Sequence, residues 1–215
     1  MPPLIGRRKL LQVTGLRPLP ERVGRLPETR AALEYAERQH AGQRRSTDDA
    51  PFIEHPLEVG WLLYRAGAPD HVIAAGLLHD VLEKTEVSGS ELTARFGSRI
   101  GKLVRAVSED QTISGYRERK AALRQQVAAA GPEALTIFAA DKVSKVRELR
   151  AALATTARRP AVESLIPPRR VAHLRRCLDL LQERLADSSL VRLLRTELAG
   201  LNGELKTSAA RTAAA

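Results

Sequence analysis

The chain has 215 residues, a length that suits one domain with appended ends, and its 43% hydrophobic but only 3% aromatic composition favours packed helices over a β-sandwich. The single cysteine excludes an internal disulfide, and no apolar run approaches the ~20 residues of a transmembrane helix. No apolar segment follows the N-terminal basic residues, as it would in a signal peptide. We therefore expect a soluble cytoplasmic protein. The formal net charge of +10 would suit nucleic acid or small polyanions, but few aromatic residues are available to stack on bases, so we expect no nucleic-acid partner.

Helical periodicity, interrupted by Pro, Gly and polar residues, predicts a succession of helices joined by short loops. The predicted helices cover residues 27–40, 52–63, 72–82, 91–96, 98–108, 115–129 and 135–149. No segment has the alternation of a strand, and no repeat is present. The sequence therefore predicts an all-α architecture.

The ends of the chain differ in composition from its middle. Residues 1–27 are basic, contain proline and lack periodicity, so we interpret them as a flexible basic lead-in. Residues 28–155 then form the main domain, and the proline-containing stretch 155–168 is expected to be a linker. We assign residues 156–205 to a C-terminal helical extension and residues 206–215 to a disordered tail.

Leucines recur at helical spacing between residues 169 and 201, which predicts one additional C-terminal helix. The leucine stripe at 174–198 favours a helix that caps the core over one that forms a dimer seam. The oligomeric state stays open.

An apolar run at residues 74–82 contains the adjacent pair His79 and Asp80, which offers an imidazole nitrogen and a carboxylate oxygen to a metal ion. His55 stands at the start of the helix before it, and Asp141 lies within a later apolar run, where an unpaired carboxylate would destabilise the fold by several kcal/mol. Two imidazoles and two carboxylates form a mixed donor set that suits a borderline divalent ion.

The spacing alone leaves alternatives to a metal site. Asp141 could pair with Lys142 or Arg147, and the histidines could be ordinary core residues. Glu83 lies three residues after Asp80, so on a helix it shares that face and could accept a proton from water or orient it. The alternative for Glu83 is a solvated acid at a helix end.

The order of His55, His79-Asp80 and Asp141 over successive helices resembles the HD superfamily of metal-dependent phosphohydrolases. Several local sequences resemble, more specifically, the (p)ppGpp hydrolase domain of RelA/SpoT-type proteins. They are HAGQRR (40–45), PFIEHPLEV (51–59), GLLHDVLEKT (76–85), FGSRI (96–100) and AADKVSKVR (139–147). The resemblance implies an HD-domain helical bundle, a divalent metal ion that is usually Mn²⁺, and a stringent-response enzyme. Such an enzyme removes pyrophosphate from the 3′ position of the nucleotide by attack of a metal-bound water.

The resemblance also assigns roles to single residues. It makes His55, His79, Asp80 and Asp141 the metal ligands, and it places Glu83 and Lys84 at the catalytic centre. The remaining candidates share a positive charge that could bind the phosphates of a small phosphorylated nucleotide. They are Arg44, Arg45, Lys142 and Lys145.

Three positions depart from the pattern of the hydrolases. Lys84 stands where the family usually has an aspartate, and Ser144-Lys145 stand where it usually has His-Asn or Tyr-Asn. Lys84 could clamp a phosphate or protonate a leaving group, but a base cannot hold water as an acid does. A phosphohydrolase for a different nucleotide and a non-catalytic nucleotide-binding regulator therefore stand beside the (p)ppGpp hydrolase as hypotheses.

Overall fold

The structure, a computed structural model, describes residues 26–155 and 166–213. These residues contain no β-strand, and the one isolated bridge among them joins Arg44 to Pro51. The predicted all-α architecture is confirmed. In chain order the helices are α2 (Pro27–Gln39), α3 (Glu54–Arg65), α4 (Asp70–Leu78), α5 (Val81–Lys84), α6 (Gly89–Val107), α7 (Tyr116–Ala130), α8 (Pro132–Thr155), α10 (Pro168–Arg184) and α11 (Ser189–Ala213).

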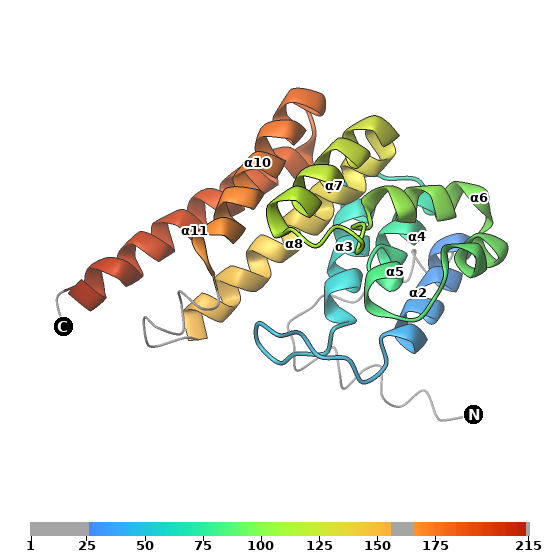
Figure 1. Cartoon of the computed structure of the whole chain (residues 1–215), viewed down its shortest axis with the longest axis horizontal. Helices are drawn as coiled ribbons and strands as arrows, with labels where there is room; N and C mark the ends of the chain where they lie inside the picture. The colour runs from blue at the N-terminus through green and yellow to red at the C-terminus, as the bar shows by residue number, and fades with distance from the viewer. Residues whose placement is uncertain (1–25, 156–165, 214–215) are drawn as a thin grey trace.

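Helix α8 lies at the centre of the arrangement. Figure 1 shows the N-terminal helices α2 to α6 on one side of it, and α10 and α11 on the other. Helix α8 contacts α3, α4, α6, α7, α10 and α11, so one hydrophobic core runs through both sides. No helix in the described part of the chain combines the length and the apolar character that a membrane span requires.

The start of α2 is fixed by a side chain from α4. Leu26, the residue before the helix, has no side chain that could cap the free amides. The Asp70 carboxylate at the start of α4 accepts hydrogen bonds from the amides of Glu28 (3.1 Å) and Thr29 (2.8 Å) instead. It also accepts one from the Thr29 hydroxyl (2.6 Å), which holds α2 against α4.

Helices α3 and α4 approach closely because each carries a glycine where they meet. A Cβ atom on Gly60 would lie 2.8 Å from Leu77 Cδ2, and one on Gly76 would lie 2.2 Å from Leu63 Cδ1. Both leucines are fully buried, so a methyl group at either glycine would force the helices or their side chains to move.

The helix that we predicted from Val72 to Leu82 is interrupted. Helix α4 ends at Leu78, the turn contains His79 and Asp80, and α5 begins at Val81. His79 Nδ1 lies 2.8 Å from the Gly76 carbonyl oxygen, the acceptor that the Asp80 amide would use in a continuous helix. The prediction of one helix is therefore wrong. The helix breaks where the His79 ring competes with the Asp80 amide for the Gly76 carbonyl.

The two helices predicted on either side of Gly97 are joined in α6. Gly97 bends this helix, with φ 81° and ψ 165°, a backbone conformation that residues with a Cβ rarely adopt. The predicted interruption at Gly97 is therefore present as a kink within one helix.

The C-terminal extension contains two helices where the sequence predicted one. The backbone leaves helical geometry at Leu185, which has φ −141° and ψ 48°, and α11 begins at Ser189. Leu174, Leu181, Leu194 and other leucines of the stripe are buried in the common core.

The termini can be compared with the predictions only in part. Helix α11 continues to Ala213, so the prediction of disorder from residue 206 is wrong as far as that residue. The lead-in before residue 26 and the linker residues 156–165 lie outside the described residues.

Candidate active site

The four predicted metal ligands converge between three segments of the chain. His55 lies in the first turn of α3, His79 and Asp80 form the turn after α4, and Asp141 lies in α8. The Nε2 atoms of the two histidines are 3.1 Å apart. Asp141 Oδ1 lies 3.3 Å from the His55 nitrogen, and Asp80 Oδ2 lies 3.4 and 3.6 Å from the nitrogens of His79 and His55.

The protonation of this cluster fits a cation. The Gly76 carbonyl can only accept, so the His79 proton sits on Nδ1 and leaves a lone pair on Nε2. His55 is fully buried, and burial, together with the Lys145 ammonium, lowers its pKa to about 4, so its ring is neutral at neutral pH. Two nitrogens and two carboxylates are the donor set of a borderline divalent ion. The ligand atoms of His55, His79 and Asp141 lie within 4.8 Å of one another and can reach one ion together, and Asp80 lies beside the two histidines.

Both carboxylates are ionised in spite of their burial. Burial opposes the charge of Asp80, but the positive charge of His79 and His55 in their protonated forms, and the Lys145 ammonium, outweigh that effect and lower the pKa to about 2. Asp80 is therefore already ionised at the pH where the His55 ring becomes neutral. Burial also opposes the charge of Asp141, and the Lys142 ammonium holds its pKa well below the usual range. Lys142 pairs with Oδ2 of Asp141, while Oδ1 faces His55. The ion pair that we considered as an alternative to ligation is thus present beside the candidate ligand atom.

Glu83 lies three residues after Asp80 and is an acid beside this cluster that is not a candidate ligand. It is half-buried on α5, and its Oε1 accepts a hydrogen bond from the Glu109 amide (2.7 Å). Burial, followed by the charge of Asp80, raises its pKa to about 7. A carboxyl group with that pKa can accept or release a proton at neutral pH, which a solvated acid at a helix end cannot do as readily.

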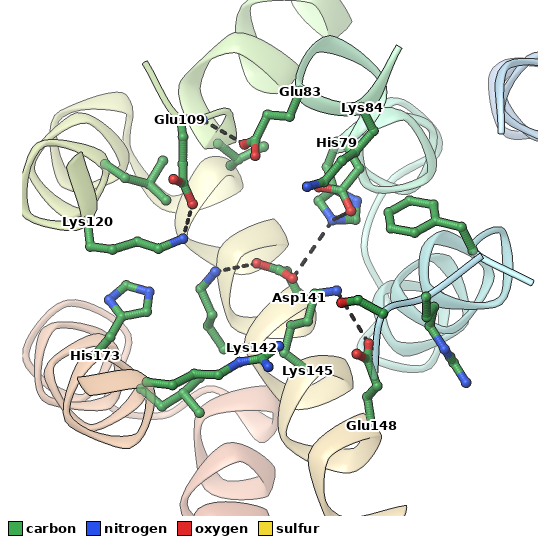
Figure 2. A pocket seen from close by; sticks show the side chains of 18 of the residues that line it. His79, Glu83, Lys84, Glu109, Lys120, Asp141, Lys142, Lys145, Glu148 and His173 are labelled. Atoms are coloured by element: carbon green, nitrogen blue, oxygen red, sulfur yellow. Dashed lines mark hydrogen bonds and ion pairs between the residues drawn. The ribbon is translucent and has the colours of Figure 1, made fainter. Parts of the chain in front are cut away.

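A cavity of about 760 Å³ opens beside the cluster, a volume within the usual range of small-molecule sites. His79, Asp80, Glu83 and Asp141 line it, and so do Lys84 and the four predicted phosphate-binding residues. In Figure 2, Glu83 and Lys84 project from α5 while Asp141, Lys142 and Lys145 project from α8.

The predicted phosphate-binding residues differ in how firmly they are held. Arg45 is mostly buried and paired with Asp48 (2.6 Å) and Glu54 (3.3 Å), whereas the more exposed Arg44 pairs with Asp49 (3.0 Å). Lys142 and Lys145 of α8 pair with acids of the same helix. Within residues 26–155 and 166–213, the exposed Lys84 ammonium has no ion-pair partner.

Several residues on the far wall of the cavity were not predicted. Glu109 pairs with Lys120 and with Arg119 (2.9 Å), and α10 contributes Arg169 and His173. Figure 2 shows His173 and Lys120 on the side of the cavity opposite His79. The two prolines before Arg169 indicate a helix start, but no local pattern indicates that this helix end returns to the cavity.

Comparisons with known proteins agree with this geometry. Residues 32–166 match the HD domain family. The human guanosine-3′,5′-bis(diphosphate) 3′-pyrophosphohydrolase MESH1 is 36% identical over 121 residues, which cover 55% of this chain and 67% of that protein. The enzyme of the same activity from Aquifex aeolicus is 34% identical over 124 residues, which cover 57% of this chain but only 18% of that protein.

A solved structure, described as that of a metazoan ortholog of SpoT that hydrolyses ppGpp, superposes with a TM-score of 0.68. It is 25% identical, and the superposition covers 83% of this chain and 97% of that chain. The similarity therefore includes more of the chain than the matched sequence segments do.

Proposed function

This chain belongs to the HD domain family, and on that premise we propose that it is a metal-dependent phosphohydrolase that removes pyrophosphate from the 3′ position of (p)ppGpp. The observation that carries the proposal is the convergence of His55, His79, Asp80 and Asp141 beside Glu83, in a cavity with cationic walls. Relatives that carry the name of this activity support the choice of substrate.

His55, His79 and Asp141 would hold a divalent ion together, and we propose that Asp80, beside both histidines, completes the set. We propose Mn²⁺ because the site mixes nitrogen and oxygen donors. When bound, such an ion lowers the pKa of water and neutralises charge that develops on phosphate oxygens. Lys142 pairs with one oxygen of Asp141, so that side chain is held in place by a partner that does not compete for the oxygen facing His55.

The proposed reaction joins a water oxygen to the phosphorus attached to the 3′ oxygen and breaks the bond between that phosphorus and the 3′ oxygen. Glu83 accepts the proton that water loses, because its raised pKa gives the carboxylate the affinity for a proton that a general base needs at neutral pH. The Glu109 amide holds Oε1 of Glu83 and leaves the other oxygen for this task. Lys84 lines the same cavity and supplies a proton or a positive charge to the departing 3′ oxygen.

The cations around the cavity bind the phosphates. Lys142 and Lys145 lie on the same helix as Asp141, and Arg44 and Arg45 lie in the loop before α3. Ammonium and guanidinium groups donate charge-assisted hydrogen bonds to phosphate oxygens, which orients a small nucleotide with several phosphates. The small-molecule partner and a cytoplasmic location belong to the proposal.

A second candidate is a related nucleotide with more phosphate charge. It is favoured by Lys84 and Lys145, which add positive charge where relatives of the resembled family usually carry an aspartate and an asparagine. A non-catalytic regulator that binds such a nucleotide is the third candidate.

The test incubates the full chain, loaded with Mn²⁺, with ppGpp, pppGpp, GTP, ATP and deoxynucleotides. Products are separated by anion-exchange chromatography, and an Asp80→Ala variant is the control. We expect GDP and pyrophosphate from ppGpp with the wild-type protein alone. Turnover of another nucleotide only would favour the second candidate, binding without turnover would favour the regulator, and no turnover of any substrate above the control would refute the hydrolase.

A further inference from the structure

The outer nitrogen of the His55 ring is held by a residue of α8. His55 Nδ1 lies 2.9 Å from Ser144 Oγ, and Ser144 is 1% exposed. Ser144 Oγ in turn donates to Glu58 Oε2, one turn further along α3 from His55, at 2.8 Å. A serine thus joins the candidate metal ligand to a carboxylate on the ligand's own helix.

The hydrogen-bonding capacity of these groups sets the position of each proton. A serine hydroxyl has one proton, and here it points to Glu58, whose carboxylate only accepts. Ser144 Oγ must therefore accept the hydrogen bond from His55, which places the ring proton on Nδ1. The remaining nitrogen, Nε2, then presents a lone pair towards His79 and the two aspartates, as a metal ligand requires.

Glu58 is itself held from outside the site. Arg147 donates to Glu58 Oε1 (3.2 Å) and to Glu197 Oε1 on α11 (2.7 Å). Arg150 pairs with the other oxygen of Glu197 (2.5 Å) and with Glu204. The orientation of the Glu58 carboxylate therefore depends on an ion-pair network that reaches the C-terminal helix.

We propose that Ser144 and Glu58 are positioning residues that fix the His55 ring and its Nδ1–H tautomer, so that Nε2 is ready to bind the divalent ion. Glu197 of α11 supports them through Arg147. The inference rests on the metal site of the proposed function but not on its substrate. It also gives Ser144 a role at a position where the sequence departs from the usual His or Tyr of the resembled family.

The first experiment measures the affinity for Mn²⁺ by calorimetric titration of the metal-free full chain. We expect Ser144→Ala to weaken binding by about 10- to 100-fold, the usual effect of removing a hydrogen-bond partner of a metal-bound histidine. Ser144→Thr keeps the hydroxyl and should bind close to the wild-type value. Thr136→Ala is the matched control, because it removes a hydroxyl of the same helix that donates to the Pro132 carbonyl and, among the described residues, has no hydrogen bond to the site.

The second experiment reads the tautomer directly. The chain has five histidines, so two-bond ¹H–¹⁵N spectra of the metal-free protein can be assigned with a His55→Gln variant. The wild-type His55 should show the Nδ1–H form, and Ser144→Ala should reduce its population. Glu58→Gln should weaken Mn²⁺ binding less than Ser144→Ala does, and Glu197→Gln less still.

The outcomes separate the possible roles. An unchanged Mn²⁺ affinity of Ser144→Ala, with a lowered melting temperature of the metal-free protein, would make Ser144 merely structural and overturn the inference. If the Ser144→Ala variant does not fold, an unchanged Mn²⁺ affinity of the Glu58→Gln variant would overturn the inference instead. A wild-type chain that binds no divalent ion overturns both the metal site and the inference, whereas Ser144-dependent metal binding without ppGpp hydrolysis overturns the proposed substrate alone.

Discussion

The helices before residue 155 and helix α10 both line the cavity, but they do so with different kinds of side chain. On the first side, His79, Asp80 and Asp141 line the cavity and are held within helices or turns whose neighbours are buried apolar residues. On the second side, Arg169 and Arg170 lie in the first turn of α10, while α11 supplies leucines to the core and acids to Arg147 and Arg150.

This difference indicates a division of tasks. The first wall has a fixed donor geometry because burial and hydrogen bonds leave its side chains little freedom. The second wall, formed by Arg169 and Arg170 at the start of α10, offers charge from side chains that solvent also reaches. We therefore expect chemistry to depend on the first wall, and the affinity for the substrate to depend in part on the second.

Removing a ligand should have the largest effect. We expect Asp141→Asn to abolish both bound Mn²⁺ and ppGpp hydrolysis, because the amide has nearly the same shape but no charge to offer the ion. Metal content by mass spectrometry and pyrophosphate release measure the two effects. The exposed Asp179→Asn on α10 is the control, and a variant at Asp141 that retained both would break the assignment of the first wall.

Glu83→Gln comes next. We expect it to lower kcat by about 10²- to 10⁴-fold, the usual contribution of a general base, with Mn²⁺ still bound. The carboxylate accepts a proton only when ionised, so the wild-type rate should rise with pH through the pKa of about 7 and then level off.

The pH profile of kcat measures this dependence. The residual rate of Glu83→Gln should lack the rise near pH 7, and the exposed Glu86→Gln should behave as the wild type. A wild-type profile that is flat between pH 6 and 8 would exclude Glu83 as the base, whatever the loss of rate in the variant.

We expect Lys145→Ala to weaken the binding of the substrate. We expect KM for ppGpp to rise by at least about 10-fold, since a hydrogen bond to a charged group contributes about 1.5–3 kcal/mol. Steady-state kinetics should show a smaller change in kcat than in KM. Lys102→Ala, at an exposed position of α6, serves as the matched loss of a positive charge.

The smallest effect is expected on the second wall. Arg169 is exposed and lies with its guanidinium 5.5 Å from the Tyr116 ring centroid. Arg169→Ala should raise KM by less than about fivefold, since exposed charge pairs contribute about 1 kcal/mol or less. The exposed Arg176→Ala of the same helix is the control. A loss of Mn²⁺ from Arg169→Ala would show that the two walls do not divide the tasks as we expect.

The sequence predicts the first wall better than the second, for a physical reason. The candidate ligands stand inside apolar helical patterns, where a polar side chain is conspicuous, and they follow a known order along the chain. The second wall depends on contacts between residues far apart in sequence, which bring the start of α10 to the cavity. No periodicity indicates such a return.

Two local features also escaped prediction because they depend on single side chains. The break between α4 and α5 arises where the His79 ring takes the Gly76 carbonyl, although the surrounding apolar pattern is continuous. Ser144 stands where the resembled family usually has a His or Tyr, and its role is indicated by its hydrogen bonds to His55 and Glu58. Composition and spacing contain neither fact.

The glycines at the crossing of α3 and α4 have a consequence for the metal centre. His55 lies in α3 and His79 directly follows α4. The distance between the two imidazole rings therefore depends on the distance between the axes of these two helices. That distance depends on the hydrogen atoms that Gly60 and Gly76 have in place of methyl groups. The distance between the two histidine ligands thus depends on two glycines that are not ligands themselves.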